Sequence, residues 1–126
     1  MSAQPGTIVW NELNTHDVES ARSFYSKVFG WEFSTDNPQN YTVALKDGKM
    51  VAGLFDLSAG EETKAAPPSW LTYVETDDIK AACEAALAAG GTCLRPAFHV
   101  DGVGMIGIIL DNTGACLALM QSDDPT

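Results

Sequence analysis

The sequence predicts an α+β domain built from two tandem modules, each in the order strand, helix, strand, strand, strand. Three observations support this prediction. Residues 7–34 form a strand–helix–strand unit with well-marked helix ends, this unit recurs 61 positions later, and a turn joins two further strands in each half. A chain of 126 residues, 45% of them hydrophobic, is long enough for one domain with its own core.

The first unit sets the pattern. Residues 7–14 are typical of a strand, and apolar side chains at helical spacing predict a helix over 18–29. Asp17 can accept hydrogen bonds from the unpaired N–H groups of the first turn, which makes it the expected N-cap. Gly30 can adopt the left-handed conformation that often ends a helix. The chain then becomes extended again over residues 31–34.

The second half repeats this unit in register. The cap-to-glycine distance is 13 residues in both halves, which favours a true internal repeat over two unrelated units. The recurring positions are Thr15, Asp17, Ala21 and Gly30, which become Thr76, Asp78, Ala82 and Gly91. The second helix is therefore expected over 79–89, ended by the glycine pair at 90–91.

Alternation and turn residues predict the remaining elements. Asp47-Gly48 is a strong hairpin signal, residues 95–104 are expected to form a loop holding His99, and the tail from Ser122 is expected to fray. Strands are predicted at 41–45, 50–57, 70–75, 92–94, 105–110 and 115–120. Residues 58–69, rich in small, charged and proline side chains, divide module one (7–57) from module two (70–121) within one domain of residues 1–126.

Composition excludes several classes of protein. The net charge is −10, so a nucleic-acid phosphate backbone would repel the chain. The sequence has no run of 18 apolar residues, so no membrane-spanning helix is expected. The first residues lack the pattern of a secretory leader. Three cysteines without metal-ligand spacing favour a reducing compartment, the cytoplasm, over a disulfide framework or a structural zinc site.

This pattern resembles the vicinal oxygen chelate superfamily, which includes the glyoxalases, bleomycin-resistance proteins and extradiol dioxygenases. The matching residues are Asp17-Val18-Glu19, Phe24-Tyr25, Phe29-Gly30-Trp31, Asp77-Asp78-Ile79, Gly90-Gly91 and Asp111-Asn112-Thr113-Gly114. The resemblance implies a glyoxalase/bleomycin-resistance-type open half-barrel with the helices outside and a cleft enclosed by paired modules. It is more specific for the fold than for an activity, because function resides in the site.

Metal-dependent members of this superfamily place four His or Glu ligands on the first and last strands of the two modules. Carried onto this sequence, those positions fall on Trp10, Gly53, Leu71 and Ala118. None of these side chains can donate an electron pair to a divalent metal. We therefore expect no metal and no other cofactor.

Side-chain alternation, combined with the resemblance, assigns one face of the strands to the cleft. The expected ligand-binding residues are Trp10, Asn14, Phe55, Leu71, Tyr73, Glu75, His99, Cys116 and Ala118. They would form an apolar site with a few polar groups, as is usual for small molecules. Cys116 is expected to be inert, and His99 to lean over the mouth of the cleft.

Glu12 is the candidate for chemistry, because a carboxylate in the middle of a strand, between Asn11 and Leu13, is costly to bury unless it is paired. One interpretation makes it a base or a ligand anchor. The other makes it an ordinary glutamate, paired with a backbone amide or a basic side chain, or reaching water. Tyr73 has the same two interpretations, a role in the site or a half-buried strand tyrosine.

The sequence thus predicts a metal-free member of the superfamily that binds a small, partly apolar molecule. Two alternatives remain: a metal-dependent lyase or dioxygenase like the glyoxalases, and a subunit whose sheet edges serve assembly. We also expect a homodimer, because exposed strands and apolar faces need covering. The sequence names neither the ligand nor a reaction, and it leaves open whether the modules pair within one chain or between two.

Overall fold

The computed structural model describes residues 4–37, 40–61 and 63–123. The chain divides into two compact units. Module one is Trp10–Leu71, and module two is the chain from Thr72 onward together with the residues up to Val9. The predicted linker at 58–69 therefore belongs to module one, where Leu57–Ala59 form a short 3-10 turn, η1.

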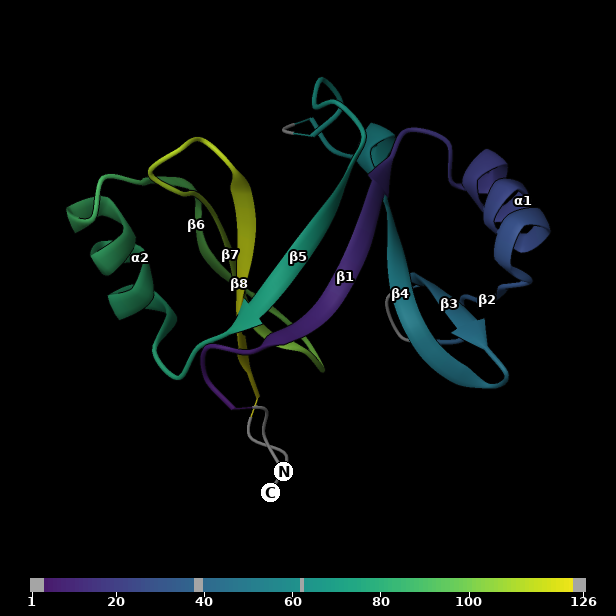
Figure 1. Ribbon diagram of the computed structural model, residues 1–126, viewed down its shortest axis with the longest axis horizontal. Helices are drawn as coiled ribbons and strands as arrows, with labels where there is room; N and C mark the ends of the chain where they lie inside the picture. Colours follow the sequence, from purple (N-terminus) through teal and green to yellow (C-terminus); the bar gives the residue numbers. More distant parts are fainter. Residues whose placement is uncertain (1–3, 38–39, 62, 124–126) are drawn as a thin grey trace. The chain divides into compact units, whose positions relative to one another are not determined.

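Module one is a four-stranded sheet in the order β2-β3-β4-β1 with one helix, α1 (Figure 1). Strands β1 and β4 are parallel, and the other neighbours are antiparallel. The elements are β1 (Ile8–Thr15), α1 (Val18–Phe29), β2 (Glu32–Ser34), β3 (Thr42–Lys46) and β4 (Lys49–Asp56). Asp47 and Gly48 between β3 and β4 both have positive φ, as the predicted hairpin turn requires.

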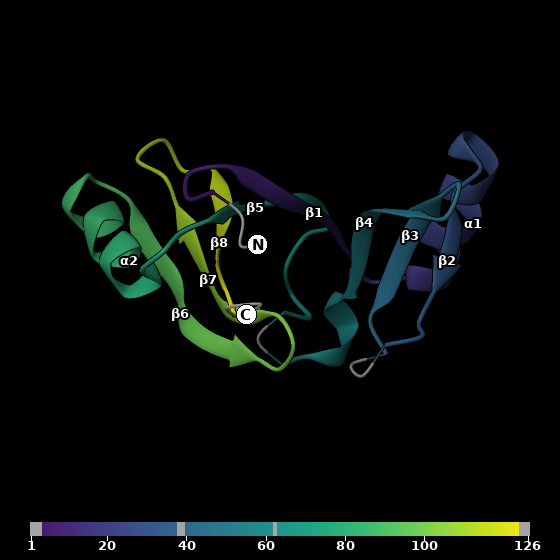
Figure 2. The same cartoon turned by 90° about the horizontal axis from the view of Figure 1, so that it is seen from below.

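Module two has the same plan, with the order β5-β8-β7-β6 and a parallel β5–β8 pair (Figure 2). Its elements are β5 (Ser69–Glu75), of which Ser69–Leu71 fall within module one, and α2 (Ile79–Ala88), β6 (Thr92–Val100), β7 (Gly104–Leu110) and β8 (Cys116–Ser122). Each half is therefore a strand–helix–strand–strand–strand module, and the predicted α+β fold class is confirmed.

The helix ends follow the predicted capping. The Asp17 carboxylate accepts from the Ser20 amide at 3.0 Å, and the Asp78 carboxylate accepts from the Ala81 amide at 3.1 Å. Gly30 ends α1 with a left-handed φ of 74°. Helix α2 ends at Ala88, one residue earlier than predicted.

Each helix packs on one face of its own sheet. In module one, Leu13, Ala52 and Leu54 form the core beneath α1, together with Ala44. In module two, Ile79 and Cys83 of α2 pack on Ile109 and Leu119. The residues that alternate with these core positions point to the other side of the sheet, which we call the open face of each module.

Two local predictions were wrong. The loop expected at 95–104 is largely strand, because β6 continues through Pro96 to Val100. Strand β6 lies at the end of the module-two order and, among the described strands, pairs with β7 alone, so the missing N–H of Pro96 is tolerated. The register shifts around Arg95. The tail was expected to fray from Ser122, which instead ends β8, while residues 124–126 of that tail lie outside the described residues.

The start of the chain is also ordered by module two. The Gly6 amide donates to the Glu75 carbonyl at 2.8 Å, and the Glu75 amide donates to the Thr7 carbonyl at 2.9 Å. The three cysteines, Cys83, Cys93 and Cys116, are free thiols. In the described part of the chain, no helix has the length and apolarity needed to cross a membrane.

Candidate functional site

The open face of module one carries the sequence-predicted residues of β1 and β4. Leu13 points into the core, so its neighbours Glu12 and Asn14 point to the open face, and Trp10 shares their parity. The parallel pairing sets Glu12 beside Gly53 and Asn14 beside Phe55. Glu12 and Asn14 are buried, with 7% and 9% of their surface exposed. The structure thus brings together four of the predicted residues on one surface.

Glu12 has a hydrogen-bonding partner that the sequence analysis did not consider. The Tyr41 hydroxyl donates to Oε2 of Glu12 at 2.5 Å, and it accepts from the indole N–H of Trp10 at 3.2 Å. The indole bond polarises the phenol and so strengthens its donation to the carboxylate. The expectation that a buried Glu12 requires a partner is therefore met by a tyrosine.

Gly53 makes room for this arrangement. A β-carbon at this position would overlap the Tyr41 hydroxyl and would lie 2.6 Å from Cε2 of the same ring. A glycine inside a strand often marks the close approach of another group, and here that group is a tyrosine ring. This interior glycine is the signal in the sequence that could have pointed to a bulky side chain crossing β4, although it does not reveal which one.

Leu71 completes the predicted positions in module one. The Trp70 indole donates to the Tyr25 hydroxyl at 3.2 Å on the α1 side, so Leu71 points to the open face and is buried.

The open face of module two carries a second group of predicted residues. Leu119 points into the core beneath α2, so Ala118 lies on the open face, beside Tyr73 in the parallel pairing. Tyr73 and Glu75 share this face and are buried. Cys116 has the same parity at the exposed start of β8, where partial burial raises the pKa of its thiol. A raised pKa suits the inert cysteine that was expected.

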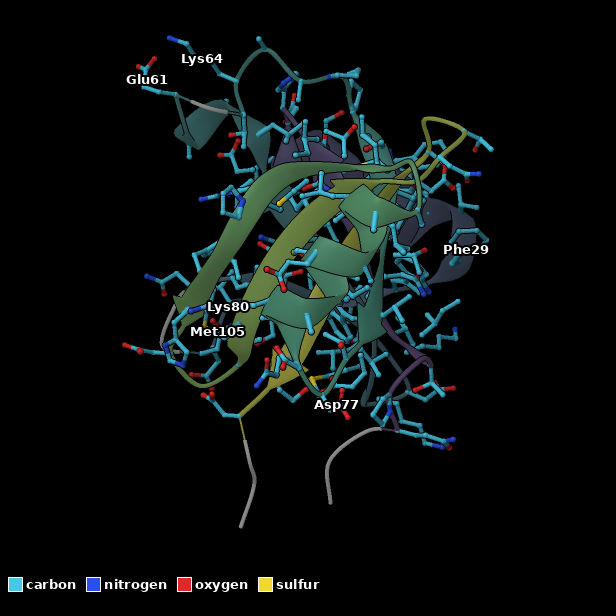
Figure 3. All side chains as sticks on the ribbon, turned by 90° about the vertical axis from the view of Figure 1, so that its left-hand side faces the viewer. Phe29, Glu61, Lys64, Asp77, Lys80 and Met105 are labelled. Atoms are coloured by element: carbon cyan, nitrogen blue, oxygen red, sulfur yellow. The ribbon has the colours of Figure 1, made fainter. Side chains whose placement is uncertain are left out.

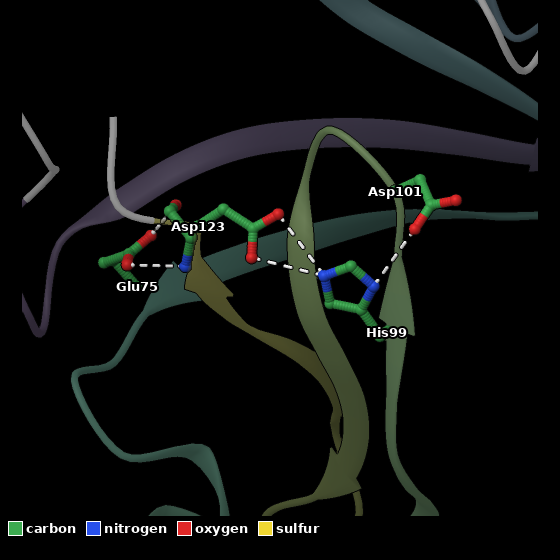
Figure 4. Close-up of polar contacts among 5 residues, drawn as sticks. Glu75, His99, Asp101 and Asp123 are labelled. Atoms are coloured by element: carbon green, nitrogen blue, oxygen red, sulfur yellow. Dashed lines mark hydrogen bonds and ion pairs between the residues drawn. The ribbon is translucent and has the colours of Figure 1, made fainter. Parts of the chain in front are cut away.

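Glu75 is held within module two. Its carboxylate accepts from the Ser122 hydroxyl at 2.6 Å and from the Ser122 amide at 3.0 Å (Figure 4). Since both carboxylate oxygens of Glu75 accept hydrogen bonds from Ser122, the last residue of β8, Glu75 stabilises the end of that strand. This explains the residue structurally without requiring a role in ligand binding.

His99 lies in strand β6 and not in a loop over a cleft. It is paired with Met105, which packs against the core beneath α2, so this register places His99 on the α2 side, away from Ala118 and Tyr73. Its Nε2 lies 3.2 Å from Asp123 and its Nδ1 lies 3.4 Å from Asp101 (Figure 4). The structure does not bring His99 together with the other predicted residues of module two.

The residues at the four aligned metal positions do not fit a metal. The Trp10 indole is a hydrogen-bond donor only, and it is already directed at Tyr41. Gly53 has no side chain, while Leu71 and Ala118 are aliphatic. Over the described ranges, no three His, Cys, Asp or Glu side chains lie close enough to hold a metal ion together.

A surface hollow in module two lies at the end of α2, apart from these faces. Its lining comprises Ala86, Ala89, Gly91, Ile109, Asp111 and Asn112. Its carboxylate, Asp111, already accepts from the Thr113 hydroxyl at 2.7 Å, so the hollow holds no convergent set of polar groups. A phenol bonded to a buried carboxylate can position and pass on a proton, so the Tyr41–Glu12 pair is the candidate arrangement for chemistry.

Comparisons with known proteins agree with this fold. The family described as the Glyoxalase/Bleomycin resistance protein/Dioxygenase superfamily matches residues 7–119. CFP32 of Mycobacterium tuberculosis, provisionally named a glyoxylase, is 34% identical over 123 residues, covering 94% of this chain and 46% of its own length. The anthracycline biosynthesis protein DnrV of Streptomyces peucetius is 29% identical, covering 93% of this chain and 47% of its own. The chain thus spans about half the length of these relatives.

Solved structures show the same fold at low sequence identity. Methylmalonyl-CoA epimerase from Mycobacterium tuberculosis has a TM-score of 0.56 at 15% identity, with 98% of this chain and 94% of that chain covered. A superfamily member from Vibrio splendidus has a TM-score of 0.58 at 17% identity, with 93% and 100% covered. The repeated module, the matching family description and these structural neighbours together show that the chain belongs to the Glyoxalase/Bleomycin resistance protein/Dioxygenase superfamily, the vicinal oxygen chelate group.

Proposed function

We propose that this chain binds a small, partly apolar organic molecule on the open face of module one, without a divalent metal at the four aligned positions. The observation that carries the proposal is the buried Glu12 carboxylate, bonded by Tyr41 above Gly53. Burying a carboxylate is costly unless it is paired, so a buried carboxylate that accepts from a tyrosine hydroxyl is a candidate for function. Glu12 then serves as the ligand anchor or as a base.

The surroundings of the pair support a ligand of mixed polarity. Trp10 and Phe55 offer aromatic surface on the same face, and Asn14 adds an amide on that face beside Phe55. Such a combination of aromatic surface with a few polar groups is typical of small-molecule sites. The three free thiols support a reducing, cytoplasmic location for this binding.

The names of the relatives suggest the wider setting. One is provisionally a glyoxylase and another takes part in anthracycline biosynthesis, and both are about twice as long as this chain. A metal-dependent lyase or dioxygenase would need donors that Trp10, Gly53, Leu71 and Ala118 lack. We therefore place sequestration or metal-free proton chemistry ahead of metal-assisted chemistry.

The test is to identify what the purified full chain retains. Small molecules are released by denaturation and identified by mass spectrometry for the wild type and for Glu12→Gln, which keeps the size of the side chain but removes its charge. We expect a specific molecule on the wild type and its loss from the variant. Glu84→Gln, at an exposed position on α2, is the matched control and should retain the molecule. Equal retention by wild type and Glu12→Gln would remove the assignment of Glu12.

A further inference from the structure

Two of the three cysteines meet between α2 and β6, in a part of module two that the proposed ligand site does not use. Cys83 of α2 belongs to the buried core cluster, and Cys93 of β6 packs against that cluster. Burial raises the pKa of the Cys83 thiol, and the neighbouring Cys93 thiol raises it further, as expected for two thiols in contact. Figure 3 looks onto α2 from outside and shows the helix lying over the strands of its own sheet.

The internal repeat shows that the fold itself brings these two positions together. Counted from the N-cap of each helix, Cys83 corresponds to Arg22. Counted from the left-handed glycine that follows each helix, Cys93 corresponds to Phe33. In module one the Arg22 guanidinium lies over the Phe33 ring, 5.6 Å from its centroid. The same helix position therefore meets the same strand position in both modules, with a cation and a ring in one and two thiols in the other.

The third cysteine is not placed to compete for this contact. Leu117 packs against the core beneath α2, so its neighbour Cys116 lies on the open face of module two. Cys83 and Cys93 lie on the other side of the sheet, beneath α2. Because a disulfide requires its two sulfur atoms to be within bonding distance, the sheet excludes Cys116 as a partner of either.

The two thiols differ in their access to solvent, and this sets the order in which they react. Cys83 exposes 9% of its surface, whereas Cys93 is half-buried and lies in the strand at the end of the module-two order. The thiolate is the reactive form, so the raised pKa of Cys83 further slows its reaction with a reagent from outside. Cys93 therefore reacts first, and Cys83 second.

We propose that Cys83 and Cys93 are a redox-active pair that closes to a disulfide by exchange with a small organic disulfide and so fastens α2 to β6. In the first step the Cys93 thiolate attacks one sulfur of the organic disulfide and displaces its other half as a thiolate. In the second step the Cys83 thiolate attacks the Cys93 sulfur of this mixed disulfide and displaces the remaining half. The two protein thiols are oxidised, the organic disulfide is reduced to two thiols, and these take up the two protons.

A reversible bond suits the reducing location proposed for this chain. Disulfides of cytoplasmic proteins are usually transient, and they often sense the redox state. Both cysteines lie in module two, so closure joins a helix to its own sheet. The pair acts independently of the ligand proposed for module one.

The test treats the folded full chain with an excess of glutathione disulfide, traps the remaining thiols and locates any bond by mass spectrometry. Cys116→Ser is the background, because it leaves only the two thiols of the pair. Proteolytic cleavage after Glu84, the one acidic residue between the two cysteines, separates them, so only a disulfide then holds the two fragments together. We expect a chain lighter by two hydrogen atoms, whose fragments stay joined until dithiothreitol is added.

Two further variants in this background separate the roles of the thiols. With Cys83→Ala, Cys93 should stop at the mixed disulfide and carry one glutathione per chain. With Cys93→Ala, the buried Cys83 should stay reduced, with a rate of modification at least about 10-fold below that of Cys93. Because Cys93 is only half-buried, its removal tests the pair even where loss of the buried Cys83 prevents folding.

The melting temperature of the oxidised chain gives an independent readout. A bond that fits the native fold should raise it by about 5 °C or more, and dithiothreitol should reverse the rise. The Cys93→Ala variant, treated in the same way, should show no shift. A chain that gains glutathione without closing, a pair that stays reduced, or a disulfide that lowers the melting temperature would each overturn the proposal.

Discussion

The hydroxyl of Tyr41 donates a hydrogen bond of 2.5 Å to Oε2 of Glu12, joining residues 29 positions apart in the chain. Tyr41 comes just before β3, whereas Glu12 lies within β1. The two strands are not neighbours in the sheet, because β4 lies between them. The tyrosine therefore reaches across β4, and it can do so because Gly53 leaves the space above that strand empty.

Replacing Tyr41 with phenylalanine should destabilise the protein. The change removes one donor to the buried Glu12 carboxylate and the acceptor of the Trp10 indole. A lost bond to a buried charged group costs about 1–3 kcal/mol of unfolding free energy. Urea unfolding followed by circular dichroism would measure it. Tyr25→Phe is the control, because its hydroxyl also accepts from an indole, that of the exposed Trp70, and it should cost less than about 1 kcal/mol.

Gly53→Ala should separate Tyr41 from Glu12 without unfolding the chain. The new methyl group meets the end of a tyrosine side chain and not backbone, so the ring can move aside. We expect a loss of about 1–3 kcal/mol, as for other overpacked sites, together with loss of the retained molecule. At Gly107 an added β-carbon would find its nearest neighbours at 3.5 Å or more, and Gly107→Ala should change the unfolding free energy by less than about 1 kcal/mol. Equal effects of the two changes would contradict this account.

Asp111 should make the free energy of unfolding depend on pH in the acidic range. The Thr113 hydroxyl, followed by the amides of Ala115 and Thr113, holds the pKa of the Asp111 carboxyl below its usual range. A carboxylate whose folded-state pKa is lowered stabilises the fold above its unfolded pKa of about 3.9, and this contribution is lost as the pH falls through the folded value.

Unfolding measured as a function of pH would test this directly. Asp111→Asn should be less stable than the wild type near neutral pH, and the difference should shrink below about pH 4. Thr113→Val removes only the first of the hydrogen bonds to Asp111 and should give an intermediate profile. A constant difference between wild type and Asp111→Asn at every pH would show that the carboxylate's charge has no part in stability.

Removing metals should leave the protein unchanged. The aligned positions Trp10, Gly53, Leu71 and Ala118 supply no donors, so we expect well below one metal ion per chain by elemental analysis. Treatment with a chelator should change neither the melting temperature nor the retained small molecule. A melting temperature that falls with the chelator and recovers with one particular metal would instead favour a metal-dependent lyase or dioxygenase.

Local signals carried most of the fold prediction. Helix caps and tight turns act within a few residues, so they can be predicted directly from the sequence. The examples here are the aspartate N-caps Asp17 and Asp78, the left-handed Gly30 and the Asp47-Gly48 turn. The prediction failed at β6, where proline suggested a loop. Proline is excluded only from strands with partners on both sides, and the position of β6 in the sheet is not a local property.

The sequence by itself determined the repeated module, which residues of a predicted strand share one face, and the absence of ligand side chains at the aligned metal positions. These properties depend on spacing and on residue type. Tertiary structure alone decided which groups meet. In the folded chain the Tyr41 hydroxyl donates to Glu12, the Ser122 hydroxyl donates to Glu75, and His99 lies on the α2 side of its sheet. Such contacts join residues far apart in the chain, and they depend on strand order and register, which are fixed only when the whole module packs.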